Sequence, residues 1–423
     1  MFPLRTPLQR LRHTTSVLGV SETATPVIPL DSDAYWADPY PIIAELRDRH
    51  RTAVTPDGIK AVLRWSDAEE IKKRPEFENE GLEYIEKRGF KPGDPLYEWR
   101  RYSIGALNGA DHRRIRSLAS RALTPRSVEK VRPVTRQHLR SLLERHADTG
   151  EFDLREEITL VPFMSVVSFL DIEMDEAATI GQQLAGGAAE AFGPNVTPEI
   201  RDQANATFAA LMEFVGELVE SRRSTPRDDL LSRLIAAEED GHRLSRDELI
   251  VLFTNIFGGA IETTSSMMTS TFLELARHPD QLELLRRDPE GLKRGAVEEV
   301  LRYRPAFYAS GNKANADTEA AGHRFEAGEP LSIIIGGPNR DPARFSDPDR
   351  FDITRDPTIW SFTFSMGPHF CLGQALARAE LQETAAVIAR HARDLELTEE
   401  PQWLPRVMVN HVDRCPIRYR FEP

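Results

Sequence analysis

Cys371 is the residue of this 423-residue sequence whose type and setting point most directly to chemistry. It lies in the stretch FSMGPHFCLG (residues 364–373), directly before an alanine-rich segment with helical periodicity. A thiol at a helix N-terminus faces free amide groups and the positive end of the dipole, which favours the thiolate. Gly367 and Gly373 would let a backbone or a flat ligand approach closely. Because no further ligands stand nearby at zinc spacing, three roles remain open: a nucleophile, an inert buried thiol, or an axial ligand of a metal held elsewhere.

Two further segments combine ionisable and small residues. Residues 256–266 (IFGGAIETTSS) insert two glycines, Glu262 and two threonines into an otherwise apolar helical run. Such residues are poor choices for the middle of a buried helix. Residues 111–116 (DHRRIR) begin a helix and place His112 and Arg116 four residues apart, hence on one face.

Helices must position these residues, because apolar side chains recur at three- and four-residue spacing through most of residues 111–300. The longest predicted helix begins with the capping box of residues 245–248 (SRDE) and continues without proline to Pro279. Its length is about 50 Å at 1.5 Å per residue. Short β-like pieces, including a hairpin around Asp57 and Gly58, flank the helical region. The sequence therefore predicts a mainly α fold with small peripheral β-sheets.

Composition limits the class of protein. Lys and Arg number 54 against 67 Asp and Glu, and the net charge of −13 argues against a binder of nucleic-acid phosphates. No stretch approaches the ~20 apolar residues of a membrane helix. With only Cys371 and Cys415, a disulfide framework is excluded, and a reducing, cytoplasmic location is expected. Residues 1–28 are expected to form a disordered or loosely attached tail, and residues 29–423 a single domain.

The segment around Cys371 resembles the haem-ligand signature F-x-x-G-x-H-x-C-x-G of the cytochromes P-450 at every fixed position. The resemblance implies a single triangular, α-rich domain of the cytochrome P-450 fold that binds haem b, with Cys371 as the axial thiolate. It also implies that Phe364 shields the sulfur from water and that His369 points toward a haem propionate. Backbone amides after Cys371 would bond the sulfur. Gly367 and Gly373 complete the signature.

Residues 259–264 (GAIETT) resemble the family motif [AG]-G-x-[DE]-T-[TS], with Ala260 at a position where glycine is usual. Ala260 would make the groove beside the haem slightly tighter. The resemblance implies a local break in helical hydrogen bonding that holds water. It further implies that Thr263 hydrogen-bonds dioxygen and that Glu262 relays protons from solvent.

Glu299 and Arg302 match the family's E-x-x-R. Alone, such a pair is common on a solvated helix face. In the family it meets an arginine from the following coil, and Arg350 in DPDRF fits that place. We expect these three residues to form a buried group of charges that fixes the coil and retains haem.

His112 and Arg116 match the family's H-x-x-x-R, in which both residues bind haem propionates. The family usually adds an arginine in the β-segment after E-x-x-R, where this sequence reads SGNKA (residues 310–314). Asn312 takes that place and Lys313 follows it. One propionate is therefore expected to be held by Asn312, by Lys313 or by a residue outside the motifs.

The predicted activity is that of a soluble, bacterial-type haem-thiolate monooxygenase, which inserts one atom of dioxygen into a small, largely apolar organic substrate. The resemblance implies electrons from a ferredoxin (or flavodoxin) and its NAD(P)H-dependent reductase, docking near Arg113 and Arg114, and a monomer without a membrane anchor. Two alternatives are a peroxide-driven or rearranging enzyme of the same fold and a haem sensor or carrier without turnover. The candidate substrate contacts are Phe257, Ile261, Phe307 and Tyr308.

Overall fold

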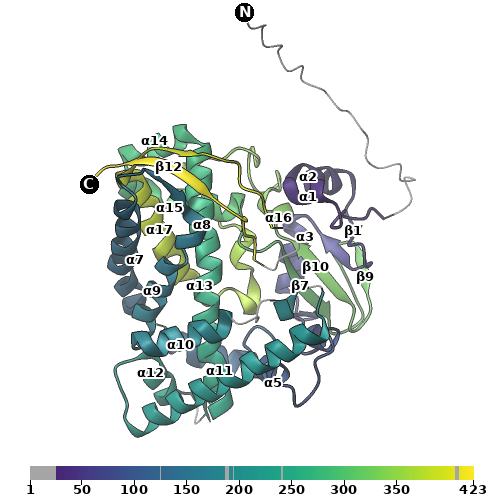
Figure 1. The fold of residues 1–423 in the computed structure, drawn as a ribbon. Coiled ribbons are helices and arrows are strands. Elements are labelled where there is room, and N and C mark those ends of the chain that lie inside the picture. Colours follow the sequence, from purple (N-terminus) through teal and green to yellow (C-terminus); the bar gives the residue numbers. More distant parts are fainter. Residues whose placement is uncertain (1–24, 124, 186–189, 194, 240–241, 405–408) are drawn as a thin grey trace, which may run out of the picture.

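Helices make up most of the chain, as the sequence pattern predicts (Figure 1). The computed structural model describes residues 25–423 except 124, 186–189, 194, 240–241 and 405–408, so most of the predicted tail lies outside the described residues. None of the described helices combines the length and apolarity needed to cross a membrane. The helices are α1 (Asp33–Ala37), α2 (Tyr40–Arg49), α3 (Trp65–Lys73), α4 (Glu83–Glu86), α5 (Pro95–Tyr102), α6 (Gly109–Ala122), α7 (Pro125–Arg145), α8 (Leu154–Glu157), α9 (Leu160–Leu170), α10 (Met174–Ala185), α11 (Pro198–Ser224), α12 (Leu230–Ala236), α13 (Arg246–Arg277), α14 (Pro279–Arg287), α15 (Pro289–Tyr303), α16 (Gly336–Asn339) and α17 (Gln374–His391).

The strands form small sheets outside the helical body. One sheet has the order β1-β2-β10-β7-β3 and another the order β11-β12-β4, while β5 pairs with β6 and β8 with β9. Figure 1 shows the first sheet on one side of the molecule and helices α7, α9, α15 and α17 on the other, with α13 between them. The strands are β1 (Ala53–Val54), β2 (Lys60–Val62), β3 (Phe77–Glu78), β4 (Glu151–Asp153), β5 (Glu238–Glu239), β6 (His242–Arg243), β7 (Ala309–Ala314), β8 (Thr318–Ala320), β9 (His323–Phe325), β10 (Pro330–Ile334), β11 (Ala392–Leu397) and β12 (Pro416–Phe421).

The predicted hairpin is confirmed at β1 and β2, which pair antiparallel. Gly58 lies in its turn with φ +83°, a conformation that glycine adopts without steric cost. Packing against this hairpin begins before residue 29, where the folded body was expected to start. Val27 forms a parallel bridge with Val54, and Ile28, which we assigned to the tail, is fully buried.

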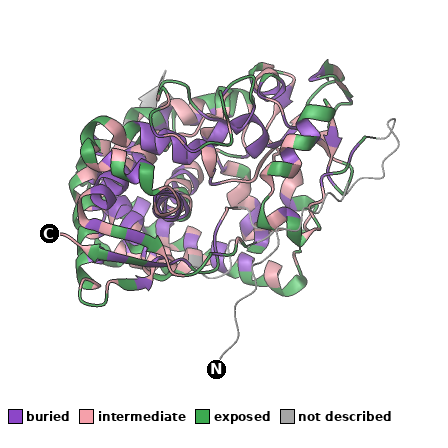
Figure 2. Ribbon diagram, turned by 90° about the horizontal axis from the view of Figure 1, so that it is seen from above, coloured by how far each residue is buried: buried purple, intermediate pink, exposed green. Residues whose placement is uncertain are grey.

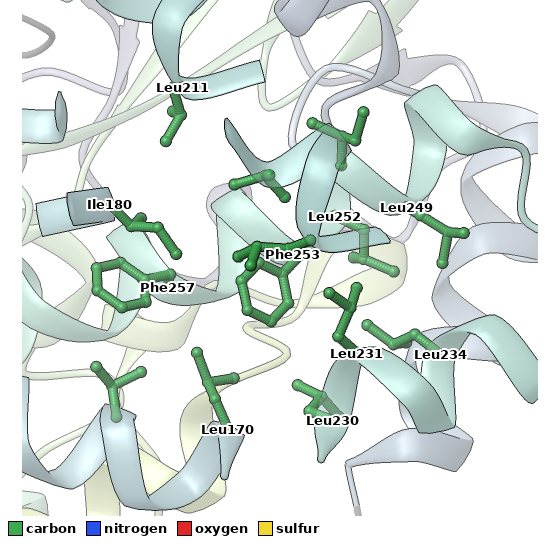
Figure 3. Close-up of a cluster of buried hydrophobic side chains, with 14 of the residues drawn as sticks. Leu170, Ile180, Leu211, Leu230, Leu231, Leu234, Leu249, Leu252, Phe253 and Phe257 are labelled. Atoms are coloured by element: carbon green, nitrogen blue, oxygen red, sulfur yellow. The ribbon is translucent and has the colours of Figure 1, made fainter. Parts of the chain in front are cut away.

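Helix α13 joins two hydrophobic clusters, and its capping box of Ser245 and Glu248 is formed as predicted. Its N-terminal half contributes Phe253 and other side chains to a cluster shared with α9 to α12 (Figure 3). Its C-terminal half contributes Phe272 and other side chains to a second cluster shared with α7, α14, α15 and α17. Buried residues accordingly concentrate on helix faces that point inward (Figure 2).

The helical turn between the two halves of α13 is less buried than the turns on either side of it. Residues 258–263 are exposed or only partly buried, although α13 is buried on both sides of them. A Cβ at Gly259 would meet nothing within 4 Å. The helix is continuous from Arg246 to Arg277, so the predicted local break in its hydrogen bonding is wrong for this structure. The Gly259 side of this turn is therefore open.

Candidate active site

The cysteine loop connects two short 3-10 turns, Phe362–Phe364 and Gly367–His369, with the start of α17. The amide of Cys371 donates to the carbonyl of Phe364 at 2.9 Å, which closes the loop. Gly367 has φ +69°, and a Cβ there would lie 2.3 Å from the carbonyl oxygen of Lys72. Glycine is therefore required at this position, both for the backbone conformation and for the close approach of α3.

The thiol of Cys371 is partly exposed and free. Burial raises its pKa, while amide groups of Gly373 and Gln374 and the positive charges of Arg116 and Arg378 act in the opposite direction. An activated nucleophile needs a lowered pKa, so this setting disfavours the nucleophile among the three roles. The amides that bond the sulfur are those expected to support a thiolate ligand.

Phe364 packs beside this loop, with the guanidinium carbon of Arg378 4.5 Å from its ring centroid. Phe364 is partly buried against the second hydrophobic cluster. A Cβ at Gly373 would meet nothing within 4 Å, which shows open space at the N-terminus of α17. The loop thus presents one sulfur and several amides to an open face, with an aromatic ring behind them.

His112 and His369 meet beside this open face, with ring centroids 4.0 Å apart. The Nε2 of His369 lies 3.0 Å from Oδ1 of Asn108, which also accepts from the amide of Asn79. Burial lowers the pKa of His112 to about 4 and that of His369 to about 3, with neighbouring positive charges acting in the same direction. Both imidazoles are therefore neutral at pH 7 in this structure, and Nε2 of His112 is buried without a hydrogen-bond partner.

Arg116 ties helix α6 to the cysteine loop, because its Nη2 donates to the carbonyl of Phe370 at 2.6 Å. Among the described residues, no ion pair of Arg116, His112 or His369 with a carboxylate is found. The three residues were predicted from two separate motifs, and the structure brings them together. A group of buried and partly buried basic side chains without acids is suited to bind an anion.

Of Asn312 and Lys313, the two residues expected to hold one propionate, Lys313 is already paired with acids, and Asn312 stays a prediction. Lys313 forms ion pairs with Glu83 at 2.8 Å and Glu78 at 3.3 Å, which satisfy its charge. The Asn312 side-chain amide donates to the Glu78 carbonyl and to Oδ1 of Asn79, and its own Oδ1 is buried without a partner. Adjacent strand residues point to opposite faces, so these two side chains cannot both serve one ligand.

The exposed turn of α13 carries the predicted acid and hydroxyl. Thr263 Oγ1 donates to the carbonyl of Gly259 at 2.7 Å. The Glu262 side chain is about half exposed, and its Oε1 lies 3.3 Å from Nε2 of the buried His411. The hydrogen bond from His411 lowers the pKa of Glu262, and burial opposes the shift. His411 belongs to no motif in the sequence, and only the fold places it beside Glu262. The hydroxyl of Ser266 on α13 donates to the carbonyl of Asn410, the residue before His411.

Glu299 and Arg302 form the expected buried pair, with Nε of Arg302 2.8 Å from the carboxylate. The third guanidinium belongs to Arg355, whose Nε lies 3.2 Å from Glu299, and the prediction of Arg350 is wrong. A turn closed by the Arg350 amide and the Asp347 carbonyl leaves the Arg350 residue exposed. Arg350 contributes its carbonyl instead, which accepts from Arg302 at 3.1 Å.

Two of the predicted substrate contacts are also wrong. Phe257 is fully buried in the first hydrophobic cluster, edge-on to Phe163, and faces no open space (Figure 3). The hydroxyl of Tyr308 lies 2.5 Å from that of Tyr35, and its ring packs on Trp36, in a group formed with α1 and α2.

Ile261 and Phe307 stay candidates for substrate contact because both are only partly buried. Ile261 and Ala260 lie on the exposed turn of α13 and pack against the first cluster. Leu184 of α10, which sequence reasoning missed, lies 3.4 Å from a Cβ placed at Gly258. Apolar side chains therefore lie next to the open Gly259 side of α13 along the helix.

A flat, dianionic porphyrin fits this arrangement. The turn of α13, with empty space at Gly259, leaves room for it. Cys371 offers a sulfur whose anionic form nearby amide groups stabilise, and the unpartnered Nε2 of His112 offers a donor for an anionic edge.

Comparison with known proteins identifies the family. The cytochrome P450 family model matches residues 193–290 and 292–393. The chain is 36% identical over 316 residues to cytochrome P450 107B1 of Saccharopolyspora erythraea, covering 73% of this chain and 75% of that protein. It is 31% identical to 6-deoxyerythronolide B hydroxylase of the same organism, over 93% of this chain and 99% of the relative. The crystal structure of CalO2 superimposes with a TM-score of 0.85 at 27% identity, covering 94% and 99%.

The chain belongs to the cytochrome P450 family, and it has the cytochrome P450 fold. It is a cytochrome P450 monooxygenase whose cofactor is haem b with an axial cysteine thiolate.

Proposed function

We propose that this monooxygenase oxidises a small, largely apolar organic molecule, with Cys371 as the thiolate ligand and with electrons from a ferredoxin or flavodoxin and its reductase. The observation that carries the proposal is the incompletely buried turn of α13, which carries Thr263 and the exposed Glu262 next to partly buried apolar residues. A sensor or carrier would not require a hydroxyl and an acid at this place. A peroxide-driven relative would not require this proton path either.

The bound haem supplies the activation of dioxygen and the oxidation of the substrate. The amides of Gly373 and Gln374 stabilise charge on the Cys371 sulfur, and Phe364 excludes water from its side. His112 and Arg116 bind the anionic edge of the cofactor through N–H donors.

The protons that the reaction consumes travel through the turn of α13. Glu262, half exposed, takes a proton from solvent and passes it inward. Thr263 holds the next hydroxyl, which is oriented by the Gly259 carbonyl. His411 keeps Glu262 ionised and in place between transfers. Positioned proton transfer of this kind contributes roughly 10²- to 10⁴-fold to rates.

The substrate class follows from the lining. Ile261, Ala260 and Leu184 are apolar and only partly buried, and a substrate pocket built from such residues would bind through apolar burial with few polar contacts. The relative named 6-deoxyerythronolide B hydroxylase supports an organic substrate. A cytoplasmic location and a monomeric state belong to the same proposal, and two free cysteines support the former.

Replacement of each cysteine tests the ligand assignment. Cys371→Ala removes the thiolate, so the absorption band that thiolate-ligated ferrous haem gives with carbon monoxide should be lost. Cys415→Ala is the matched control, because Cys415 is buried and its burial raises its pKa to about 12. A retained band in Cys371→Ala, or a lost band only in Cys415→Ala, would contradict the assignment.

A further inference from the structure

Lys72, near the end of α3, carries a buried charge without an acidic partner. The residue is 8% exposed, and its ammonium nitrogen donates to Ser310 Oγ at 3.1 Å. Within the described part of the chain, no carboxylate forms an ion pair with it. An ammonium buried in this way is costly unless it is paired, and burial lowers the pKa of Lys72 to about 8. Among the described residues, the Lys72 ammonium is therefore a buried cation without an anionic partner.

The position of Lys72 puts this charge beside the group of basic residues at the cysteine loop. Its carbonyl lies against Gly367, where even a Cβ would come within 2.3 Å. Its charge contributes to lowering the pKa of His369, together with His112 and Arg116. Four basic side chains from α3, α6 and the cysteine loop thus share one environment. Two of them, Lys72 and Arg116, carry positive charge at pH 7, and the anionic edge of haem carries two carboxylates.

Ser310, which binds the Lys72 ammonium, lies on β7, the strand that was expected to supply a basic ligand for a haem propionate. Ser310 and Asn312 lie two residues apart on β7 and therefore share one face, while Lys313 lies on the other. Lys313 is held by Glu78 and Glu83 and is not available. On the face shared by Ser310 and Asn312, β7 provides an uncharged hydroxyl and an uncharged amide. The ammonium of Lys72 on α3 binds the hydroxyl.

We infer that Lys72, oriented by Ser310, binds a propionate of the haem in place of an arginine from β7. The inference rests on the proposed haem site and adds a ligand that no sequence motif marks. The long side chain reaches from α3, and its charge is balanced once the carboxylate is present. Ser310 holds the ammonium in the same position before and after binding.

Haem release provides the test. Holoenzyme variants Lys72→Met and Lys72→Arg are mixed with excess apomyoglobin, and transfer of haem is followed optically. Lys72→Met should release haem about tenfold faster or more, because one partner of a buried charge pair has been removed. Lys72→Arg should stay within about twofold of the unaltered enzyme, because a donor cation is retained. Lys73→Met is the matched control, since Lys73 is exposed and pairs with Glu69.

A second haem separates carboxylate binding from packing. The unaltered enzyme and Lys72→Met are reconstituted with haem dimethyl ester, whose propionates carry no charge. If Lys72 binds a propionate, the two proteins should release the ester at equal rates. Faster release of both haems from Lys72→Met than from the unaltered enzyme would show a packing role and overturn the inference. Equal release of haem b from the two proteins would also overturn it. Lys72→Gln gives the same comparison if Lys72→Met takes up no haem.

The ferric–ferrous potential gives an independent readout. A cation beside the propionate destabilises the ferric state, which carries more positive charge than the ferrous state. Loss of this cation therefore favours the ferric state, and the midpoint potential of Lys72→Met should move to more negative values. An unchanged potential would contradict the inference. Failure of the proposed function is distinguishable, because the Cys371→Ala experiment reads the ligand at the iron, whereas these experiments read the retention of the porphyrin edge.

Discussion

At the scale of single residues, the side chains proposed to hold the cofactor differ in their surroundings from those proposed to move protons. The buried His112 and the partly buried His369 are neutral and close together, as suits donors to a carboxylate. Glu262 is half exposed and ionised beside His411. Burial thus favours the neutral form of the two histidines, which remain hydrogen-bond donors. Exposure keeps Glu262 ionised and able to exchange protons with solvent.

Thr263→Ala should uncouple the reaction. The hydroxyl that passes a proton inward is lost, while haem binding and consumption of reductant continue, because Thr263 touches no group that retains the cofactor. Product should fall roughly tenfold or more, and hydrogen peroxide should rise in its place. Product, peroxide and NAD(P)H are measured together. Thr264→Ala is the adjacent control, since Thr264 is buried on another face of α13. Unchanged coupling in Thr263→Ala would refute the proton-transfer role.

His411→Gln should shift the pH dependence of turnover. The hydrogen bond from His411 lowers the pKa of Glu262, so its removal raises that pKa. A relay carboxylate must be ionised to accept the next proton, and turnover therefore falls as pH decreases through its pKa. The acidic limb of the profile should move to higher pH in His411→Gln. Glu262→Gln should abolish that limb, and a limb that stays in place in both variants would identify another group.

At the scale of elements, helix α15 and the following coil are fixed together by buried charges. Glu299 accepts from Arg302, from Arg355 and from the amide of Asp352 at 2.7 Å. A Cβ at Gly295 would lie 2.2 Å from the carbonyl of Ile353, which shows how closely the coil packs on the helix. The coil leads into the cysteine loop, so this packing also sets the position of the sulfur.

Arg355→Ala should destabilise the fold far more than Arg350→Ala. The first change removes a guanidinium from a buried carboxylate, which costs about 3 kcal/mol. The second removes an exposed side chain and keeps the carbonyl that accepts from Arg302, so its effect should stay within about 0.5 kcal/mol. Denaturant unfolding of both variants, with haem absorbance as a second probe, measures the difference. Equal effects would show that the charge group does not depend on Arg355.

At the scale of the whole molecule, the cysteine loop reaches the surface on the face that also carries the start of α6. Gly367, Pro368 and Gly373 are exposed there, and so is Arg113. Arg114, expected to share the docking surface, is instead paired with Glu248 of α13. An acidic electron donor that docks over the loop would therefore meet Arg113 rather than Arg114.

Arg113→Glu should slow reduction by a ferredoxin, and the dependence on ionic strength should weaken, because a rim charge mainly affects the association rate. Stopped-flow reduction at several salt concentrations measures both effects. Arg49→Glu is the control, since Arg49 is exposed on α2 and remote in the sequence from the cysteine loop. Equal reduction rates in Arg113→Glu and the unaltered enzyme would place the donor elsewhere.

Much of the molecule is determined by local pattern. The capping box at Ser245, the hairpin turn at Gly58 and the helix after Cys371 were predicted correctly, because caps, turn residues and helical periodicity act over a few residues. The cysteine signature and the pairing of Glu299 with Arg302 were likewise predicted from short spacings. Each of these depends on neighbours in the chain.

The tertiary structure alone decided the partners that come from distant segments. Lys72 and His411 carry no motif, and each reaches its site only because α3 and the C-terminal segment pack against elements far away in sequence. Arg355 rather than Arg350 meets Glu299 because a turn directs one side chain to solvent. Phe257 was misassigned because spacing gives a helical period and leaves the direction of each face to packing.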